Sequence, residues 1–368
     1  MFRTNITQGN SCQAVSHKTS LATQEGFCVD PVDVKFSSTS AFLEISTGEL
    51  KVFVELPDES HRVLFYSIDL KMTLTREIKS VVDFDGSVTQ EWYSDNNESI
   101  YGMGQNVNGE LNYRAAPLQL IQYNTEAVVP FFVSTRQYGI LWDNYAWGMF
   151  NSPENELDVN STSFVPRESG TYWFYVVDVS AVWDTGEFTL SLTDSISKTI
   201  HTCEHKLHNM PNSVSCKFKK LEAKRSYIVS FSQSRMRAPK VFYNSMETYL
   251  KTSLHAKSGN VIDYYFVHGK TVDGTIKGYR IISGTAFMLP RWAYGFWQCK
   301  ERYHTQEELL ESARQFRNRS IPVDNIVQDW QYWGKLGWGP HWVSCYSKIY
   351  ARLTKIHRTN LSILIREV

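Results

Sequence analysis

The sequence lacks a long apolar run, and this absence excludes the simplest kind of membrane protein. Its longest apolar candidate, AVVPFFV at Ala127 to Val133, suits a buried strand and is far shorter than the roughly 18 residues that a membrane helix needs. The first residues, MFRTNITQGNSCQ, do not contain the apolar stretch of a secretion signal. We therefore expect a soluble protein with no membrane partner, and its compartment is not fixed by the sequence.

The sequence also lacks an excess of charge of either sign. The 38 Lys and Arg residues equal the 38 Asp and Glu residues, so no net field would gather nucleic acid or an anionic membrane. One basic segment, CKFKKLEAKRSY from Cys216 to Tyr227, could be a polyanion site, but a solvated β-hairpin is the more ordinary interpretation. We expect no nucleic-acid partner, and the oligomeric state is not predicted.

Cysteine is too sparse for a small domain held together by disulfides, with six residues in a chain of 368. We expect mostly free thiols or one or two disulfides. Cys203 with Cys216 and Cys12 with Cys28 are the pairs nearest in sequence. The sequence does not decide between free thiols and these pairs.

The segment HTCEHKLH raises the alternative of a zinc site. In a strand, His201, Cys203 and His205 would lie on one face and could share a metal ion. Their spacing matches no standard zinc module, and histidines on a strand face are usually just solvated. We expect no metal and no cofactor.

Aromatic residues are abundant, at 14% of the chain. The flat faces and polar edges of Trp and Tyr suit sugars, but the same residues also fill the cores of β-sandwiches. Composition alone favours the core interpretation.

The first two thirds of the chain have the pattern of antiparallel β structure. From about Asp33 to Asn151, short alternating runs are separated by turn residues, as in AFLEISTGELKVFVEL, where TGEL predicts a tight turn. Between about Asn160 and Tyr243 the composition shifts toward Ser, Thr and Lys while strand-like runs persist, which indicates a separate β-module inserted in a loop of the first domain. After it, NVIDYYFVHG predicts a strand and TVDGTIKGYRIISG a helix ending near Gly284.

From Pro290 the pattern becomes that of a parallel α/β unit. WAYGFWQ predicts a strand, and TQEE predicts a capping box in which Thr305 and Glu308 begin a helix. NIVQD, SKIYARLTKIH and LSILI then predict a strand, a helix and a third strand. In a barrel of such units the active-site residues stand just past the carboxyl ends of the strands, and Asp329 of IVQDWQYWG has that position.

These segments resemble glycoside hydrolase family 31, the α-glucosidase and α-xylosidase family. The resemblance is carried by PRWAYGFWQCKERYHTQEELLE (290–311), IPVDNIVQDWQYWG (321–334) and the stretch from YGMGQ to YGILWDN (101–144). ESGTYWFYVVDV is similar to the start of the protective-antigen-type β-module that some α-xylosidases carry inside their sandwich.

The resemblance implies a multidomain fold: an N-terminal β-sandwich with an inserted β-module, followed by the first strands of a (β/α)8 TIM barrel. The implied domains are a galactose-mutarotase-like sandwich (1–160), the inserted module (161–243), a last sandwich strand with a linker helix (244–288), and an incomplete catalytic barrel (289–368).

The resemblance also implies a sugar-binding site. Asp329 would anchor hydroxyls of the sugar that is cleaved, Trp330 and Trp333 would wall the pocket, and Trp297 and Glu301 would line its entrance. The loop with Asn112 and Arg114 would reach toward the barrel mouth.

Ordinary structural roles stand beside these assignments. Trp297 and Trp333 would equally serve as barrel packing, and Glu301 as a surface ion pair with Lys300 or Arg302. Asp329 would instead cap a helix or form a salt bridge.

The implied activity is retaining, metal-independent hydrolysis of non-reducing α-linked xylose or glucose from oligosaccharides. Retaining enzymes need two carboxylates about 5 to 5.5 Å apart, and the resemblance puts the nucleophile at the end of a fourth strand and the acid/base on a later loop. Because the third strand ends just before Val368, we expect neither catalytic residue in this chain and no activity of the chain alone. The alternative is a non-catalytic carbohydrate-binding or structural remnant, which in-frame coding sequence beyond Val368 would argue against.

Overall fold

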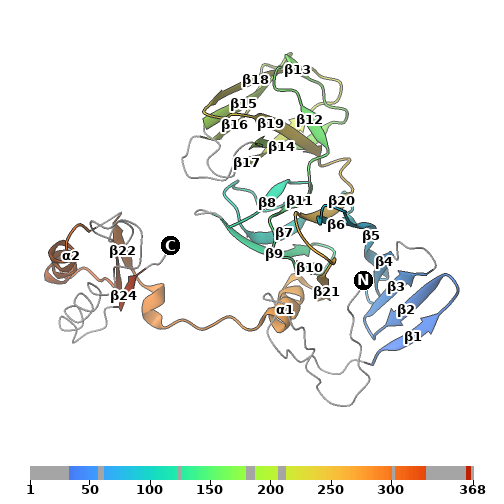
Figure 1. Ribbon diagram of the computed structural model, residues 1–368, viewed down its shortest axis with the longest axis horizontal. Helices are drawn as coiled ribbons and strands as arrows, with labels where there is room; N and C mark the ends of the chain where they lie inside the picture. The colour runs from blue at the N-terminus through green and yellow to red at the C-terminus, as the bar shows by residue number, and fades with distance from the viewer. Residues whose placement is uncertain are drawn as a thin grey trace. The chain divides into compact units, whose positions relative to one another are not determined.

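The computed structural model describes residues 33–56, 62–122, 126–179, 187–205, 213–300 and 303–328, together with the backbone of 362–365. The chain divides into two compact units, and the division falls between Thr285 and Ala286. Figure 1 shows that strands dominate the first unit, in several sheets with few helices. In the described part of the chain, no helix is both long enough and apolar enough to cross a membrane.

The first unit begins with a sandwich of two antiparallel sheets, here called the first sandwich. Alternation of apolar and polar residues gives each strand one buried face, as in β4 and β6. The larger sheet runs in the order β1 (Lys35–Ser38), β2 (Phe42–Ser46), β3 (Leu50–Glu55), β4 (Val63–Ser67), β5 (Met72–Val82), β6 (Val88–Tyr93), β20 (Lys251–Ala256), β11 (Gly148–Phe150) and β8 (Leu118–Leu120). The smaller sheet runs in the order β21 (Tyr264–His268), β10 (Tyr138–Trp142), β9 (Ala127–Ser134) and β7 (Ile100–Gln105).

Large aromatic side chains fill the first sandwich. Trp92 is fully buried and meets the rings of Trp142 and Tyr264 edge to face, with centroids 6.5 and 5.1 Å apart. The predicted turn at TGEL is confirmed, because it joins β2 to β3. The abundance of aromatic residues thus has a packing explanation in this core.

Helix α1 (Val272–Ser283) covers the smaller sheet. The Thr271 hydroxyl caps it by accepting a hydrogen bond from the Gly274 amide at 2.9 Å. Tyr279 stacks on Phe131 of β9 with centroids 4.2 Å apart. The helix ends at Gly284, whose φ of 87° favours glycine, so the predicted helix and its stop are confirmed.

Between β11 and β20 the chain forms a second pair of antiparallel sheets, here called the second sandwich (155–245; Figure 1). One sheet has the order β12 (Asn155–Leu157), β19 (Pro239–Ser245), β14 (Gly170–Asp178) and β17 (Ser213–Leu221). The other has the order β13 (Ser163–Phe164), β18 (Tyr227–Ser234), β15 (Glu187–Asp194) and β16 (Ile200–His205). An apolar cluster that includes Phe174, Leu190 and Val241 lies between them.

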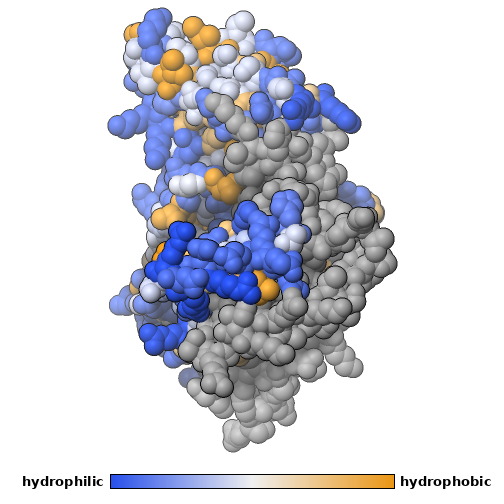
Figure 2. Space-filling view, turned by 90° about the vertical axis from the view of Figure 1, so that its left-hand side faces the viewer, coloured by the Kyte–Doolittle hydropathy of each residue, from blue (hydrophilic) through white to orange (hydrophobic). Residues whose placement is uncertain are grey.

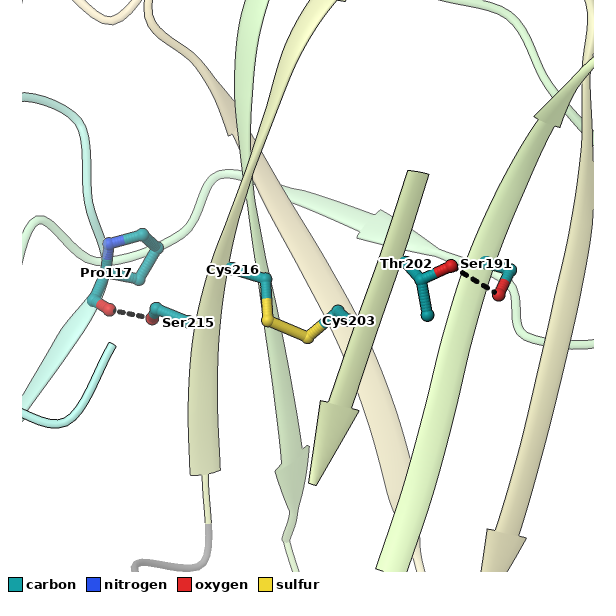
Figure 3. The surroundings of a disulfide bond; sticks show 6 residues. All are labelled: Pro117, Ser191, Thr202, Cys203, Ser215 and Cys216. Atoms are coloured by element: carbon teal, nitrogen blue, oxygen red, sulfur yellow. Dashed lines mark hydrogen bonds between the residues drawn. A yellow bond between two sulfur atoms is a disulfide. The ribbon is translucent and has the colours of Figure 1, made fainter. Parts of the chain in front are cut away.

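A disulfide joins the two sheets of the second sandwich. Cys203 of β16 is bonded to Cys216 of β17, with Cα atoms 5.8 Å apart (Figure 3). This pairing is one of those that the sequence left open, and it overturns the zinc alternative, because a disulfide sulfur is not available as a thiolate ligand.

The predicted hairpin from Cys216 to Tyr227 is wrong. β17 pairs with β14, whereas β18 pairs with β13 and β15 in the other sheet. The basic segment is therefore a crossover between sheets. Its Arg225 forms an ion pair with Asp194 at 2.8 Å.

The second unit contains a parallel sheet. The described elements of this unit are, in chain order, the 3-10 helix η1 (Arg291–Tyr294), β22 (Trp297–Lys300), α2 (Gln306–Asn318), β23 (Asn325–Gln328) and β24 (Ser362–Ile365). β23 lies between β22 and β24 and pairs with both in parallel, as predicted. The start of WAYGFWQ is not a strand, because residues 291–294 form η1. The helix predicted at SKIYARLTKIH lies outside the described residues.

The capping box that begins α2 is confirmed. The Thr305 hydroxyl accepts a hydrogen bond from the Glu308 amide at 3.1 Å, and the Glu308 carboxylate accepts one from the His304 amide at 2.7 Å. Leu309, Leu310 and Ala313 form the buried stripe of the helix. α2 thus packs on the strands through the predicted apolar face.

Candidate active site

The two edges of the parallel sheet differ in character. Trp297 is in register with Asn325, and Lys300 with Gln328, so the carboxyl ends of the strands lie at one edge. Gln328 is likewise in register with Ile365 of β24. Loops that follow this edge hold the active site in barrels of this kind.

Hydrogen bonds to main-chain groups fix the amino edge. The Asp324 carboxylate accepts from the Phe296 amide at 2.9 Å, and the Asn325 side chain donates to the Trp292 carbonyl, also at 2.9 Å. The Trp297 indole donates to the Ala293 carbonyl at 3.0 Å. This edge is a scaffold, because its polar groups are used within the fold.

At the carboxyl edge, α2 and the strand ends share a small polar network. The Lys300 ammonium forms an ion pair with the Glu308 carboxylate and lies 5.4 Å from the ring centre of Tyr303. Gln328 is buried and donates a hydrogen bond to the Tyr303 carbonyl at 3.5 Å. The hydrogen bond from Lys300 is the largest influence on Glu308, and it holds the pKa of that carboxyl below its usual value.

Of the predicted sugar-binding residues of the barrel segment, only Trp297 belongs to the described part of the chain. Trp297 is the first residue of β22, at the amino edge, and is half-buried with its ring 6.2 Å from that of Trp292. The other four barrel residues lie outside the described residues: Glu301, Asp329, Trp330 and Trp333. Their roles stay predictions. Asp329 directly follows Gln328, the last residue of β23.

Arg114 and Asn112 lie in the first unit. Arg114 is only 3% exposed, and its guanidinium donates to the carbonyls of Met246 and Tyr249. The Asn112 side chain accepts from the Ile100 and Arg114 amides, each at 3.1 Å. Burial lowers the pKa of Arg114. These contacts give Arg114 a structural role where the chain returns from the second sandwich and give Asn112 one within the first sandwich, and the contact of either with a sugar stays a prediction.

Two buried carboxylates of the first sandwich were missed by the sequence analysis. Glu98 accepts hydrogen bonds from the hydroxyls of Ser94, Ser134 and Tyr138 and from the Asp95 amide. A carboxylate next to turn residues, as in SDNNESI, gives no sign of burial in the sequence.

The second of these carboxylates, Glu77, is 2% exposed. It accepts hydrogen bonds from the Tyr264 hydroxyl at 2.6 Å and from the Val63 amide at 3.1 Å. Burial outweighs these hydrogen bonds and raises the pKa of Glu77 to about 7. Within the described residues, no group of three or more His, Cys, Asp or Glu side chains is placed to hold a metal ion.

Two antiparallel β-sandwiches and a segment of in-register parallel strands covered by a helix define a mostly β protein that also carries a parallel α/β segment. Residues 286–365 match the model of the glycosyl hydrolases family 31 TIM-barrel domain. The relationship to glycoside hydrolase family 31 that the sequence predicts is therefore confirmed.

Curated relatives match different lengths of the chain. An α-xylosidase of Saccharolobus solfataricus is 27% identical over 323 residues, which are 85% of this chain and 30% of that protein. An α-glucosidase of Bacillus thermoamyloliquefaciens is 35% identical over 74 residues, which are 20% of this chain and 9% of that protein. The chain spans about 30% of the length of the α-xylosidase relative and 32% of that of a family 31 glucosidase from Pseudescherichia vulneris.

Solved structures share the fold. The family 31 α-xylosidase of Xanthomonas citri superposes with a TM-score of 0.66 at 22% identity, covering 94% of this chain and 44% of that one. The family 31 dextranase of Flavobacterium johnsoniae superposes with a TM-score of 0.57 at 18% identity, covering 95% of this chain and 32% of that one.

Proposed function

We propose that this chain serves a glycoside hydrolase of family 31 type that releases α-linked xylose or glucose from the non-reducing ends of oligosaccharides, with retention of configuration. In this proposal the first sandwich is a galactose-mutarotase-like domain, the second sandwich is a protective-antigen-type module, and the parallel sheet is part of a (β/α)8 catalytic barrel.

The observation that carries the proposal is the position of Asp329. In the sequence it comes directly after Gln328, the last residue of β23, whose carboxyl end lies at one edge of a parallel sheet, and it belongs to the segment that matches the family 31 barrel. A carboxylate at that edge accepts hydrogen bonds from sugar hydroxyls, and such bonds strengthen as positive charge develops on the ring in the transition state.

The Lys300–Glu308 ion pair bears on the proposed role of Glu301. Lys300, one of the two cations with which Glu301 would pair on the surface, already pairs with Glu308 across the start of α2. We propose that Glu301, Trp330 and Trp333 line the sugar site together with Asp329. Trp297 does not fit the predicted entrance role, because it begins β22 at the amino edge and its indole donates to the Ala293 carbonyl there.

Retaining hydrolysis further needs a nucleophile and an acid/base, and we propose that neither is among these 368 residues. The chain alone should then bind a sugar without cleaving it. A chimera in which the barrel residues of the Xanthomonas citri α-xylosidase follow this chain should cleave it.

The test is an assay of both proteins with 4-nitrophenyl α-D-xyloside and α-D-glucoside. We expect turnover by the chimera with at least one substrate, and none by the chain alone above a buffer blank. A chimera that unfolds cooperatively but cleaves neither substrate would overturn the proposed activity. Cleavage by the chain alone would overturn the placement of the catalytic pair.

A further inference from the structure

The second sandwich contains a cavity of about 190 Å³ at the end where it joins the first sandwich. Its walls come from β12, β13, β14 and β19 and from the segments after β13 and β19. On the face drawn in Figure 2, hydrophobic side chains of this sandwich lie scattered between hydrophilic ones. The described part of that face offers no continuous apolar patch, so we take the cavity as the candidate ligand site of this sandwich.

Three aromatic rings form the apolar wall of the cavity. Phe164 meets Tyr172 and Tyr243 edge to face, with ring centroids 5.8 and 5.1 Å apart. Phe164 and Tyr172 are buried, whereas Tyr243 is half-buried. The rings pack rigidly against one another and leave part of Tyr243 open to the cavity.

Three polar side chains on the rim have no hydrogen-bond partner within the described residues, and two of them, Arg167 and Thr248, are exposed to solvent. Among the described residues, the Arg167 guanidinium and the hydroxyls of Tyr243 and Thr248 make no hydrogen bond or ion pair, although all three residues line the cavity. The Tyr172 hydroxyl, in contrast, donates to the Glu168 carbonyl at 2.9 Å. Free donors and acceptors beside an apolar wall suit a ligand that has both CH faces and hydroxyl groups.

We propose that this cavity binds one neutral pyranose ring. Its volume is below the roughly 300–1,000 Å³ that encloses a drug-sized ligand, so it admits a single sugar ring and not a chain buried along its length. Arg167 and Glu168 bring opposite charges to the same rim, which favours a neutral ligand over an anion.

In this arrangement the ring stacks its CH face on Tyr243, and its hydroxyls pair with Arg167 and Thr248. The site uses no residue of the proposed barrel site. The choice of a sugar as the ligand rests on the proposed function, and the binding itself does not require hydrolysis.

The experiment measures binding of methyl α-D-xylopyranoside and methyl α-D-glucopyranoside to the full chain by saturation-transfer NMR titration, with myo-inositol as a polyol control. The variants Arg167→Gln and Thr248→Val remove one proposed ligand partner each and leave the ring packing intact. Arg237→Gln is the matched control, because Arg237 is an exposed arginine of the same sandwich that does not line the cavity. Asp329→Asn tests the barrel site.

We expect millimolar binding of at least one glycoside, weakened about three- to ten-fold by Arg167→Gln and by Thr248→Val, with the same weakening when Asp329→Asn is also present, and unchanged by Arg237→Gln. No binding, equal binding of myo-inositol, or unchanged affinity in both cavity variants would overturn the cavity site. Affinity that falls only in Asp329→Asn would also overturn it, while supporting the proposed barrel site.

Discussion

The first sandwich and the parallel sheet of the second unit place their acidic side chains differently. In the first sandwich, Glu77 and Glu98 are buried, and protein donors occupy their oxygens. At the parallel sheet, Asp324 is tied to the amino edge, whereas Asp329 comes in sequence after Gln328, the last residue of β23. The observed scaffold acids therefore set the standard against which the proposed ligand role of Asp329 can be judged, because stability and activity should separate the two roles.

The largest expected effect is that of removing a scaffold acid. Glu98→Ala leaves three buried hydroxyls and the half-buried Asp95 amide without their acceptor, so the free energy of unfolding should fall by about 3–5 kcal/mol. Urea unfolding measures this. Glu156→Ala is the control, because that side chain is 52% exposed and its ion pair with Lys240 should contribute less than about 1 kcal/mol. Equal losses of stability in the two variants would show that Glu98 does not stabilise the fold more than an exposed acid does.

The next effect is a pH dependence caused by Glu77. Its pKa is about 7 in the folded protein, against 4.5 for an unperturbed Glu carboxyl. Between these values the folded state holds a proton that the unfolded state has released. This contribution to stability is therefore fully present below pH 4.5 and declines by about 3 kcal/mol as the pH rises toward 7.

Urea unfolding between those two pH values checks the sign and the size of this effect. Glu77→Gln keeps an acceptor for Tyr264 and Val63 but cannot titrate, so its stability should decline less over the same range. Parallel curves for the parent and the variant would show that Glu77 is charged in the folded protein.

The second sandwich sharpens the comparison, because a disulfide crosses its largely apolar core. Replacing Cys203 and Cys216 together by Ser should lower the stability of this sandwich by about 3 kcal/mol, the value for a loop of this length. Hydrogen exchange should report faster opening of β14 and β19, and unchanged exchange in β9 and β10. The single change Cys299→Ser is the control; equal acceleration in β9 and β10 would mean that the two sandwiches unfold as one.

Local signals in the sequence predicted the elements well where neighbouring residues decide the outcome. The Thr305 cap and the stop at Gly284 depend on such signals. The parallel pairing of β22, β23 and β24 was instead predicted from the alternation of strands and helices along the chain. The crossover from β17 to β18 was missed, because alternation predicts a strand but not the strand with which it pairs.

The sequence predicted less of the candidate site than of the strands and helices. The sequence around Arg114 has no periodicity that would show its burial, and its guanidinium meets carbonyls more than 130 residues away. The cavity near Tyr243 likewise combines residues from β12 to β19. Contacts between distant segments set both features.

The most direct test of the central claim is a comparison of Asp329 and Asp329→Asn in the chimera with the Xanthomonas citri barrel, using steady-state kinetics and thermal unfolding on the same samples. If Asp329 is a ligand acid, the loss of one or more charge-assisted hydrogen bonds should lower kcat/KM by about ten-fold or more and leave Tm nearly unchanged. A kcat/KM within about threefold of the parent, together with a lower Tm, would show that Asp329 is a scaffold acid like Glu98.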